Sequence, residues 1–425
     1  MAKRPLKSGA LSVMGRRTKE PPISWLMRLK LERPKLISLA AGFTDNSTLP
    51  VDESRRILNK MLGETSLGEA SLQYGSTAGD DTLRDLTVRR IRRLDGNLPG
   101  QAVAYDAKRT IITNGSQQFL YMVTEALCDT GDIVLVEDPT YFVYLGIMQS
   151  RGISGRCVRM NRDGIDLEHL EQVLESIRCA GELNRLKILY LVSYYQNPTG
   201  RSTSRRVKAG ALELIRHYER AAGHPIYLME DAAYRELGFA GQQAPSALSV
   251  KGAADRVIYS GTYSKPFATG VRVGFGLLPD DLLAPVLRIK GNHDFGTGHL
   301  GQQLIVRALE SGVYDKNLTK GQRKYHYKAN VMTDAMRKHF PESVQWQPPQ
   351  GGLNVWAEFP RRINTGIKSR LFRKVLDRNV LYVPGGLCYI DEPTRAKPNH
   401  EMRLSFGAAS ENDICKGIRR IGQAI

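Results

Sequence analysis

The sequence predicts an α/β fold with two parts. A large doubly wound domain has a mostly parallel central sheet, and a smaller α+β domain is formed from both termini. Short apolar runs typical of strands alternate with longer stretches of helical periodicity, the pattern of a parallel sheet covered by helices. Several strand-like runs end at a polar residue, and no internal repeat interrupts the alternation. The 425 residues leave room for two domains.

The elements of the large domain follow from apolar runs and turn residues. We expect strands at residues 110–113, 133–137, 186–192, 226–230 and 257–260, and helices at residues 117–128 and 204–222. The turns Asp129-Thr-Gly-Asp and Asn197-Pro-Thr-Gly punctuate this series. Ligands bind outside the carboxyl ends of strands in open α/β sheets, so polar residues at these ends predict a site.

The smaller domain has its own pattern. We expect helices at residues 325–340 and 368–378, with strands at residues 352–358 and 402–406. The predicted large domain covers residues 46–314, and the predicted small domain covers residues 1–45 and 315–425. Because no long Gly/Ser linker separates them, the two domains should pack closely.

The composition is that of a globular protein, with 41% hydrophobic and 24% charged residues. No apolar run approaches the roughly 20 residues that span a bilayer, so we expect no membrane partner. The five cysteines are scattered and odd in number, which indicates neither a metal site nor a disulfide framework and favours the reducing cytoplasm. The basic N-terminal segment leaves a transit peptide as an alternative.

The net charge of +18 raises the question of nucleic acid binding. The basic residues are spread through the chain, and the group Arg89–Arg93 is typical of one solvated helix face. No zinc finger or aromatic RNA-binding signature is present in the sequence. We therefore expect no nucleic acid partner, and acidic substrates or solubility account for the charge.

Lys265 is the most informative candidate residue. It follows a β-prone run, and Thr262, Ser264 and Arg272 beside it offer two hydroxyls and a guanidinium fork to a phosphate. A sheltered lysine can lose its proton and form a Schiff base with an aldehyde. A reactive amine beside phosphate donors predicts pyridoxal 5'-phosphate, whereas a solvated loop lysine is the alternative.

Two further strand ends carry candidate residues. Ser116 and Gln117 open a helix after a strand, a position that favours an anion, although an ordinary serine cap is the simpler interpretation. Tyr141 follows the strand at 133–137, where its ring can stack on a cofactor or pack in the core.

Asp231 stands directly after an apolar strand, where a buried carboxylate needs a cationic partner such as a protonated pyridine nitrogen. A helix cap is the alternative. Asn197 can donate a hydrogen bond to a phenolate oxygen, or it can simply start its turn.

These motifs together resemble the fold-type I aminotransferases of the aspartate aminotransferase superfamily, most closely the branch with kynurenine/2-aminoadipate and aromatic aminotransferases. The resemblance covers nearly the whole chain. Its motifs are Ser38-Leu-Ala-Ala-Gly42, Gln73–Gly79, Asn114–Gln117, Glu137–Tyr141, Asn197–Gly200, Asp231–Tyr234, Ser264-Lys265 with Arg272, Gly351-Gly352 and Met402–Phe406.

The resemblance implies a role for each matched residue. Lys265 would form the internal aldimine, and Asp231 would pair with the pyridine nitrogen. The phosphate would be held by Ser116, Gln117, Thr262, Ser264, Arg272 and, from the partner subunit, Tyr74. Tyr141 would stack on the ring, and Asn197 and Tyr234 would bond its 3-oxygen. The substrate would contact Gly42, Asn197 and the carboxylate-binding Arg403.

The implied activity is a ping-pong transamination between an amino acid and a 2-oxo acid in a homodimer with shared active sites and no metal. Related scaffolds also support lyases, decarboxylases, racemases and oxidases, so another pyridoxal phosphate reaction is the alternative. A cofactor-sensing regulatory protein is more remote, since the match begins near residue 36 and leaves little chain for a DNA-binding module. The roles of His293, His299 and Asn354, the last a departure from the family pattern, stay open, as do the donor and the acceptor.

Overall fold

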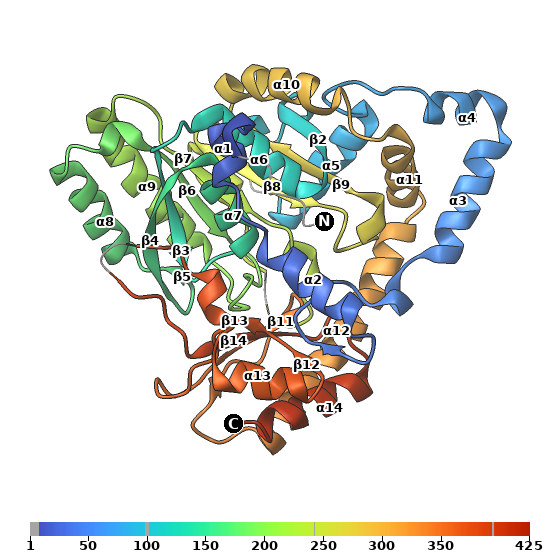
Figure 1. Ribbon diagram of the computed structural model, residues 1–425. Coiled ribbons are helices and arrows are strands. Elements are labelled where there is room, and N and C mark those ends of the chain that lie inside the picture. The colour runs from blue at the N-terminus through green and yellow to red at the C-terminus, as the bar shows by residue number, and fades with distance from the viewer. Residues whose placement is uncertain (1–7, 98–101, 242, 393–394) are drawn as a thin grey trace.

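The computed structural model describes residues 8–97, 102–241, 243–392 and 395–425. Its largest sheet has eight strands in the order β2-β9-β8-β7-β6-β3-β4-β5 (Figure 1). The pairs among β4, β3, β6, β7 and β8 are parallel, and β2, β9 and β5 pair antiparallel. The strands are β2 (Thr110–Asn114), β3 (Ile133–Asp138), β4 (Ser154–Asn161), β5 (Gly164–Ile165), β6 (Leu186–Val192), β7 (Tyr227–Asp231), β8 (Val257–Thr262) and β9 (Val273–Leu277). The predicted fold class is confirmed.

Both faces of this sheet are buried, because successive side chains of a strand point to opposite sides. On β3, Ile133 and Leu135 join one hydrophobic cluster, and Val134 and Val136 join the other. The covering and connecting helices are α5 (Asp81–Leu94), α6 (Gly115–Leu127), α7 (Phe142–Arg151), α8 (Leu167–Cys179), α9 (Arg205–Ala222), α10 (Asp280–Asp294) and α11 (His299–Glu310). A doubly covered parallel sheet is the arrangement that the near-continuous apolar strands require.

A second, antiparallel sheet lies below the first in Figure 1, with the order β10-β11-β14-β13. A short parallel pair, β1 (Ile37–Ser38) with β12 (Val380–Leu381), joins the two ends of the chain. The remaining elements are α1 (Val13–Arg17), α2 (Pro22–Glu32), α3 (Val51–Gly63), α4 (Thr65–Leu72), α12 (Val313–His339), β10 (Gln345–Trp346), β11 (Asn354–Glu358), α13 (Arg370–Asp377), β13 (Val383–Pro384), β14 (Glu401–Ser405) and α14 (Glu411–Gly422). The domain boundaries near residues 46 and 314 stay predictions, and α12 runs across the second.

The structure differs from the predicted elements in two places: one helix begins earlier, and one strand was not predicted. The helix expected at 325–340 begins at Val313, because Gly312 adopts a φ of 72° and the face bearing Tyr314 and Leu318 is buried with Tyr325. Strand β9 was not expected, because Gly274 and Gly276 interrupt its apolar pattern. Packing requires both glycines: a Cβ on Gly276 would lie 2.0 Å from the ring of Phe119.

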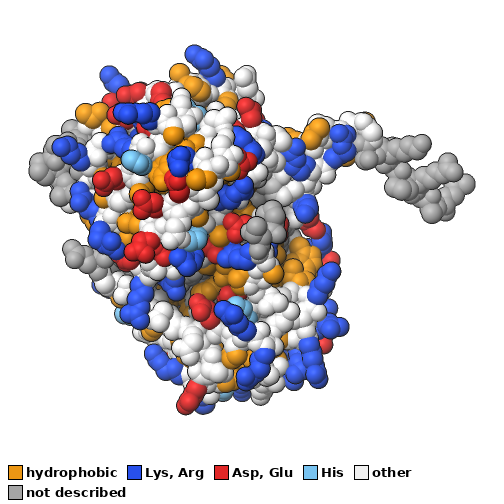
Figure 2. All heavy atoms as spheres, turned by 90° about the vertical axis from the view of Figure 1, so that its left-hand side faces the viewer, with side chains coloured by type: hydrophobic (Ala, Val, Ile, Leu, Met, Phe, Trp, Pro, Cys, Tyr) orange, Lys and Arg blue, Asp and Glu red, His pale blue; other side chains and the backbone are white. Residues whose placement is uncertain are grey.

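The surface carries basic and acidic side chains close together on the face shown in Figure 2. The group at 89–93 is not one solvated face, however, because Arg90 is buried and forms ion pairs with Glu236 and Asp315. Within the described ranges, no helix is both long enough and apolar enough to cross a membrane.

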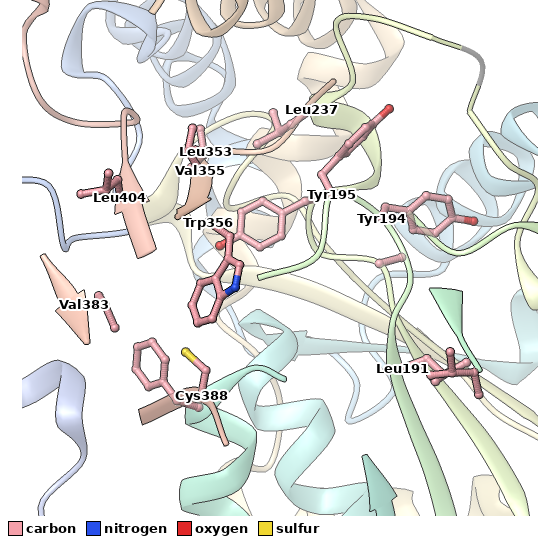
Figure 3. Close-up of a cluster of buried hydrophobic side chains, with 14 of the residues drawn as sticks. Leu191, Tyr194, Tyr195, Leu237, Leu353, Val355, Trp356, Val383, Cys388 and Leu404 are labelled. Atoms are coloured by element: carbon pink, nitrogen blue, oxygen red, sulfur yellow. The ribbon is translucent and has the colours of Figure 1, made fainter. Parts of the chain in front are cut away.

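The loop after β6 packs against the second sheet. Tyr195 belongs to the same hydrophobic cluster as Leu353, Val355 and Trp356 around β11 (Figure 3). A Cβ on Gly351 would lie 2.5 Å from the Tyr195 ring, so this close approach requires glycine. Asn197, two residues after Tyr195, is thereby held at the junction of the two sheets.

Candidate active site

One cavity of about 390 Å³ gathers most of the predicted site residues. It lies at the carboxyl ends of β6, β7 and β8. The predicted residues that line it are Gly42, Ser116, Gln117, Tyr141, Asn197, Asp231, Tyr234, Thr262, Ser264, Lys265, Arg272 and Arg403. Tyr74 is the exception: it is 83% exposed and lies outside the cavity, with its ring edge-to-face to Phe295 at 5.4 Å. The structure therefore brings the predicted strand-end residues together around one cavity, and their roles stay predictions.

One end of the cavity is suited to an anion. Helix α6 begins there, and no side chain caps its first turn, so the simpler interpretation of a serine cap is wrong. Ser264 contributes a buried hydroxyl that has no hydrogen-bond partner among the described residues. Its backbone N–H donates to Thr262 Oγ1 at 3.0 Å, which holds the loop after β8 in place. Free helix N–H groups and an unpaired hydroxyl together favour a phosphate.

Arg272 completes this end. Its backbone is left-handed, with a φ of 57°, at the turn into β9. A Cβ on Gly115 would lie 2.7 Å from Arg272 Nη2, and a Cβ on Gly274 would lie 2.4 Å from the Ser116 nitrogen. Both positions therefore need glycine so that the guanidinium, the helix start and β9 can converge on one small space.

Asp231 lies at the end of β7 and is 3% exposed. Its Oδ2 accepts a hydrogen bond from the Tyr190 hydroxyl at 2.8 Å, and its Oδ1 accepts one from Ala233 N–H at 3.0 Å. The expected alternative, a cap on an α-helix, is wrong, because only a short 3₁₀ turn follows. Burial raises its pKa to about 6. An ionised Asp231 therefore favours a cation nearby, and a protonated ring nitrogen would be one.

Lys265 lies on the loop after β8, and its Nζ donates to the Gly42 carbonyl oxygen at 2.6 Å. Burial, which has the largest effect, and the charges of Arg403 and then Arg272 together lower its pKa to about 8. The alternative of a solvated loop lysine does not fit this side chain. An amine with such a pKa is neutral in a substantial fraction of molecules near physiological pH, as a nucleophile or a general base must be.

Arg403, on β14, is 1% exposed. Its Nη1 donates to Asn197 Oδ1 at 2.7 Å, and its Nη2 donates to the Ala40 carbonyl oxygen. Its Nε has no partner among the described residues. No described carboxylate neutralises this buried cation, so the site favours a carboxylate ligand. Asn197 is therefore more than a turn residue, because it orients the guanidinium.

Sequence reasoning missed several side chains of this site. Tyr190, the partner of Asp231, is a buried residue of β6, a strand buried at all positions but Lys187, and it belongs to no recognisable motif. Ile23 and Phe43 line the cavity from α2 and from the loop after β1. The amphipathic character of α2 was the available signal, but sequence alone does not show which surface its apolar face covers. His293 does not line the cavity. Its Nδ1 lies 3.0 Å from Gln118 Nε2.

The comparisons with known proteins agree with this geometry. The sequence profile of the family described as "Aminotransferase class I and II" matches residues 34–421. A 2-aminoadipate transaminase of Thermus thermophilus is 32% identical over 400 residues, which cover 93% of this chain and 92% of that protein. The chain belongs to the class I and II aminotransferases. An uncharacterized aminotransferase of Saccharolobus solfataricus is also 32% identical and covers 93% of both chains.

Solved structures extend the likeness to the fold. A multiple substrate aminotransferase from Thermococcus profundus superposes with a TM-score of 0.85 at 29% identity, over 98% of this chain and 97% of that one. A kynurenine aminotransferase of Pyrococcus horikoshii, solved in complex with PMP, superposes with a TM-score of 0.86 at 27% identity. The match covers 98% of this chain and 96% of that one. The resemblance to the fold-type I branch with kynurenine and aminoadipate aminotransferases is confirmed.

The cofactor of this aminotransferase is pyridoxal 5'-phosphate, and the residues present fit it. Three features suit its phosphate: the Ser264 hydroxyl without a described partner, the start of α6 at Gly115, and the Arg272 guanidinium beside it. Asp231 is a buried carboxylate without a cationic partner among the described residues, which suits its pyridine nitrogen. The partly buried amine of Lys265 lies in the same cavity, which suits its aldehyde.

Proposed function

We propose that this aminotransferase moves the amino group of an amino acid to a 2-oxo acid in two half-reactions, with Lys265 as the catalytic residue. One cavity holds an amine with a lowered pKa, a helix start suited to an anion, and a buried arginine that no carboxylate of the described residues neutralises, and this observation carries the proposal. When bound, pyridoxal 5'-phosphate supplies an aldehyde that takes up amines and a ring that withdraws electrons from the substrate Cα.

The side chains of this chain then have separable tasks. Arg403 would bind the substrate carboxylate through the edge of its guanidinium that Asn197 and Ala40 leave free. Lys265 would hold the aldehyde carbon at rest and, once released, take the proton from Cα and return it on the cofactor side. Asp231 would keep the ring nitrogen protonated, and Tyr234 and Asn197 would bond the ring oxygen.

The experiment follows the absorbance of the loaded enzyme. Adding an amino acid should abolish the absorbance of the lysine-bound cofactor and release one equivalent of 2-oxo acid per site, and a second 2-oxo acid should restore it. The Lys265→Ala variant should bind the cofactor but complete neither half-reaction. Lys251→Ala, on the exposed surface, is the matched control. Failure of every 2-oxo acid to restore the absorbance would rule out transamination in favour of the lyase, decarboxylase, racemase or oxidase alternative.

The substrate we propose is an amino acid with an extended, largely apolar side chain. A second cavity of about 550 Å³ shares Ile23 and Phe43 with the first and continues along α2. Its walls include Leu26 and Met27, and Lys30 adds a positive charge. Relatives of this chain are named for 2-aminoadipate and for aromatic amino acids. A panel of donors against pyruvate and 2-oxoglutarate tests this: a preference for alanine over every long donor would contradict it.

We also propose a homodimer in which Tyr74 serves the partner's phosphate. The exposed ring pair of Tyr74 and Phe295 supports this, because two large hydrophobic rings project together beside α4. Mixing inactive Lys265→Ala with Tyr74→Ala protein tests it. Subunit exchange would create mixed dimers in which one site has both native residues, so activity should return. If the mixture stays inactive although exchange is demonstrated, the shared site is wrong.

A further inference from the structure

Asn354 is a polar residue in the core that no described contact explains. It is the first residue of β11, is 2% exposed, and has no hydrogen-bond partner for either amide atom among the described residues. Leaving a buried polar atom unpaired destabilises the folded protein. A native side chain with two such atoms therefore calls for a partner that arrives with a ligand.

The strand register places Asn354 on the face that carries Arg403. Asn354 pairs with Ser405 and Trp356 pairs with Arg403 across β11 and β14. Paired residues of an antiparallel ladder, and residues two apart on one strand, share a face of the sheet. Asn354 is thus the diagonal neighbour of Arg403, whose Nε also has no partner among the described residues.

The surroundings of Tyr234 bring the same groups together. Burial raises the pKa of Tyr234, while the Arg403 charge and the side-chain amides of Asn197 and Asn354 act in the opposite direction. Asn354 thus lies near the Tyr234 hydroxyl, although outside the geometry of a hydrogen bond. That hydroxyl faces Gly42, since a Cβ there would lie 3.8 Å from it. Asn354 itself lines a neighbouring cavity with Gly200 and not the active-site cavity, but its approach to Tyr234 places it behind the residues at the substrate end.

We propose that Asn354 is a substrate-binding residue whose Nδ2 donates a hydrogen bond to the carboxylate held by Arg403. The proposal rests on the transaminase function proposed above. An amide has two N–H groups at Nδ2, so one can meet the Tyr234 hydroxyl while the other meets a carboxylate oxygen. The Nε of Arg403 and the Nδ2 of Asn354 then have a common partner, which pairs two of the three buried atoms that have none among the described residues; the third is Asn354 Oδ1.

The test uses the loaded enzyme and a ligand that binds without turnover: the 2-methyl analogue of the best donor, which has no hydrogen on Cα. Its dissociation constant is read from the absorbance of the cofactor, and the matching amine without a carboxylate is the comparison. Asn354→Leu should weaken the 2-methyl amino acid about tenfold or more, since a hydrogen bond to a charged group is lost. The amine should bind as in the unchanged protein.

Asn354→Asp keeps the size of the side chain and should weaken the 2-methyl amino acid further by charge repulsion. Ser405→Ala is the matched control, because this register partner already bonds the Leu353 carbonyl oxygen at 3.1 Å. Unchanged binding in Asn354→Leu, or an equal loss for both ligands, would overturn the proposal. The proposal would also fail if Asn354→Leu shifted the pH titration of the cofactor absorbance without weakening binding of the amino acid. Asn354 would then act only on the Tyr234 hydroxyl and not on the substrate. If instead the unchanged protein responds to no amino acid, the proposed function itself fails.

Discussion

Replacing Lys265 by methionine should stabilise the cofactor-free protein near neutral pH. Burial, Arg403 and Arg272 together lower the pKa of Lys265 from 10.5 to about 8. This fall corresponds to about 3 kcal/mol of preference for the neutral amine in the folded state. Methionine has similar length and no charge, but it loses the hydrogen bond to Gly42, worth about 1 kcal/mol. The variant should therefore be about 2 kcal/mol more stable at pH 6.5.

The advantage should disappear as the pH rises. Between pH 8 and pH 10.5 the folded protein has released the Lys265 proton while the unfolded chain still binds it, so the native protein gains stability with pH in that window. Below pH 8 both states are protonated and the full penalty applies. The difference in unfolding free energy between variant and native protein should change by about 2.5 kcal/mol from pH 6.5 to pH 10.

The assay is urea unfolding of both cofactor-free proteins across this range, with the difference in unfolding free energy plotted against pH. Taking the difference cancels the titrations that both proteins share. Lys251→Met, at an exposed position, measures the background effect of losing a lysine. If the difference between Lys265→Met and the native protein stays constant with pH, the lysine titrates alike in the folded and unfolded chains and its pKa is not lowered by folding.

Three further perturbations test the rest of the site. Because burial raises the pKa of Asp231 from 3.8 to about 6, Asp231→Asn should stabilise the cofactor-free protein by up to about 3 kcal/mol above pH 6. The gain should vanish as the pH falls towards 3.8, while transamination in the loaded enzyme falls sharply; a gain that ignores pH would contradict this. Gly274→Ala places a Cβ 2.4 Å from the Ser116 nitrogen. It should weaken cofactor binding, measured by equilibrium dialysis, at least about tenfold through loss of cradle contacts, whereas Gly146→Ala, with open space around it, should not. Arg403→Lys replaces a bidentate guanidinium by a single ammonium group, so KM for the amino acid should rise about 10- to 100-fold while cofactor affinity stays the same. An unchanged KM would show that Arg403 does not bind the substrate.

The local pattern of the chain was enough to predict the fold class and several residues of the cavity, whereas Gly42, Tyr234 and Arg403 followed only from the family resemblance. Apolar runs that end at Asp231 and Thr262 are strands whose carboxyl ends meet at one edge of a parallel sheet, so their polar ends converge whatever the details of packing. Lys265 and Arg272 lie close in sequence, and a loop of that length keeps them near each other.

Contacts between distant segments could not be predicted in this way. The pKa of Lys265 depends on Arg403, which is far along the chain, and the pairing of Asp231 with Tyr190 depends on how β6 and β7 align. The need for glycine at position 274 arises only when β9 packs against the start of α6.

The order of residues along the chain therefore specifies which chemical groups are available and which of them end the strands of the sheet. Folding in three dimensions sets the charge states of these groups and forms the cavity along α2. It also leaves atoms of Arg403 and Asn354 without a hydrogen-bond partner among the described residues. The physical reason is that desolvation and hydrogen-bond satisfaction depend on every atom within a few ångströms. A sequence pattern specifies the neighbours of a residue along one element, and only the packed chain specifies its neighbours in space.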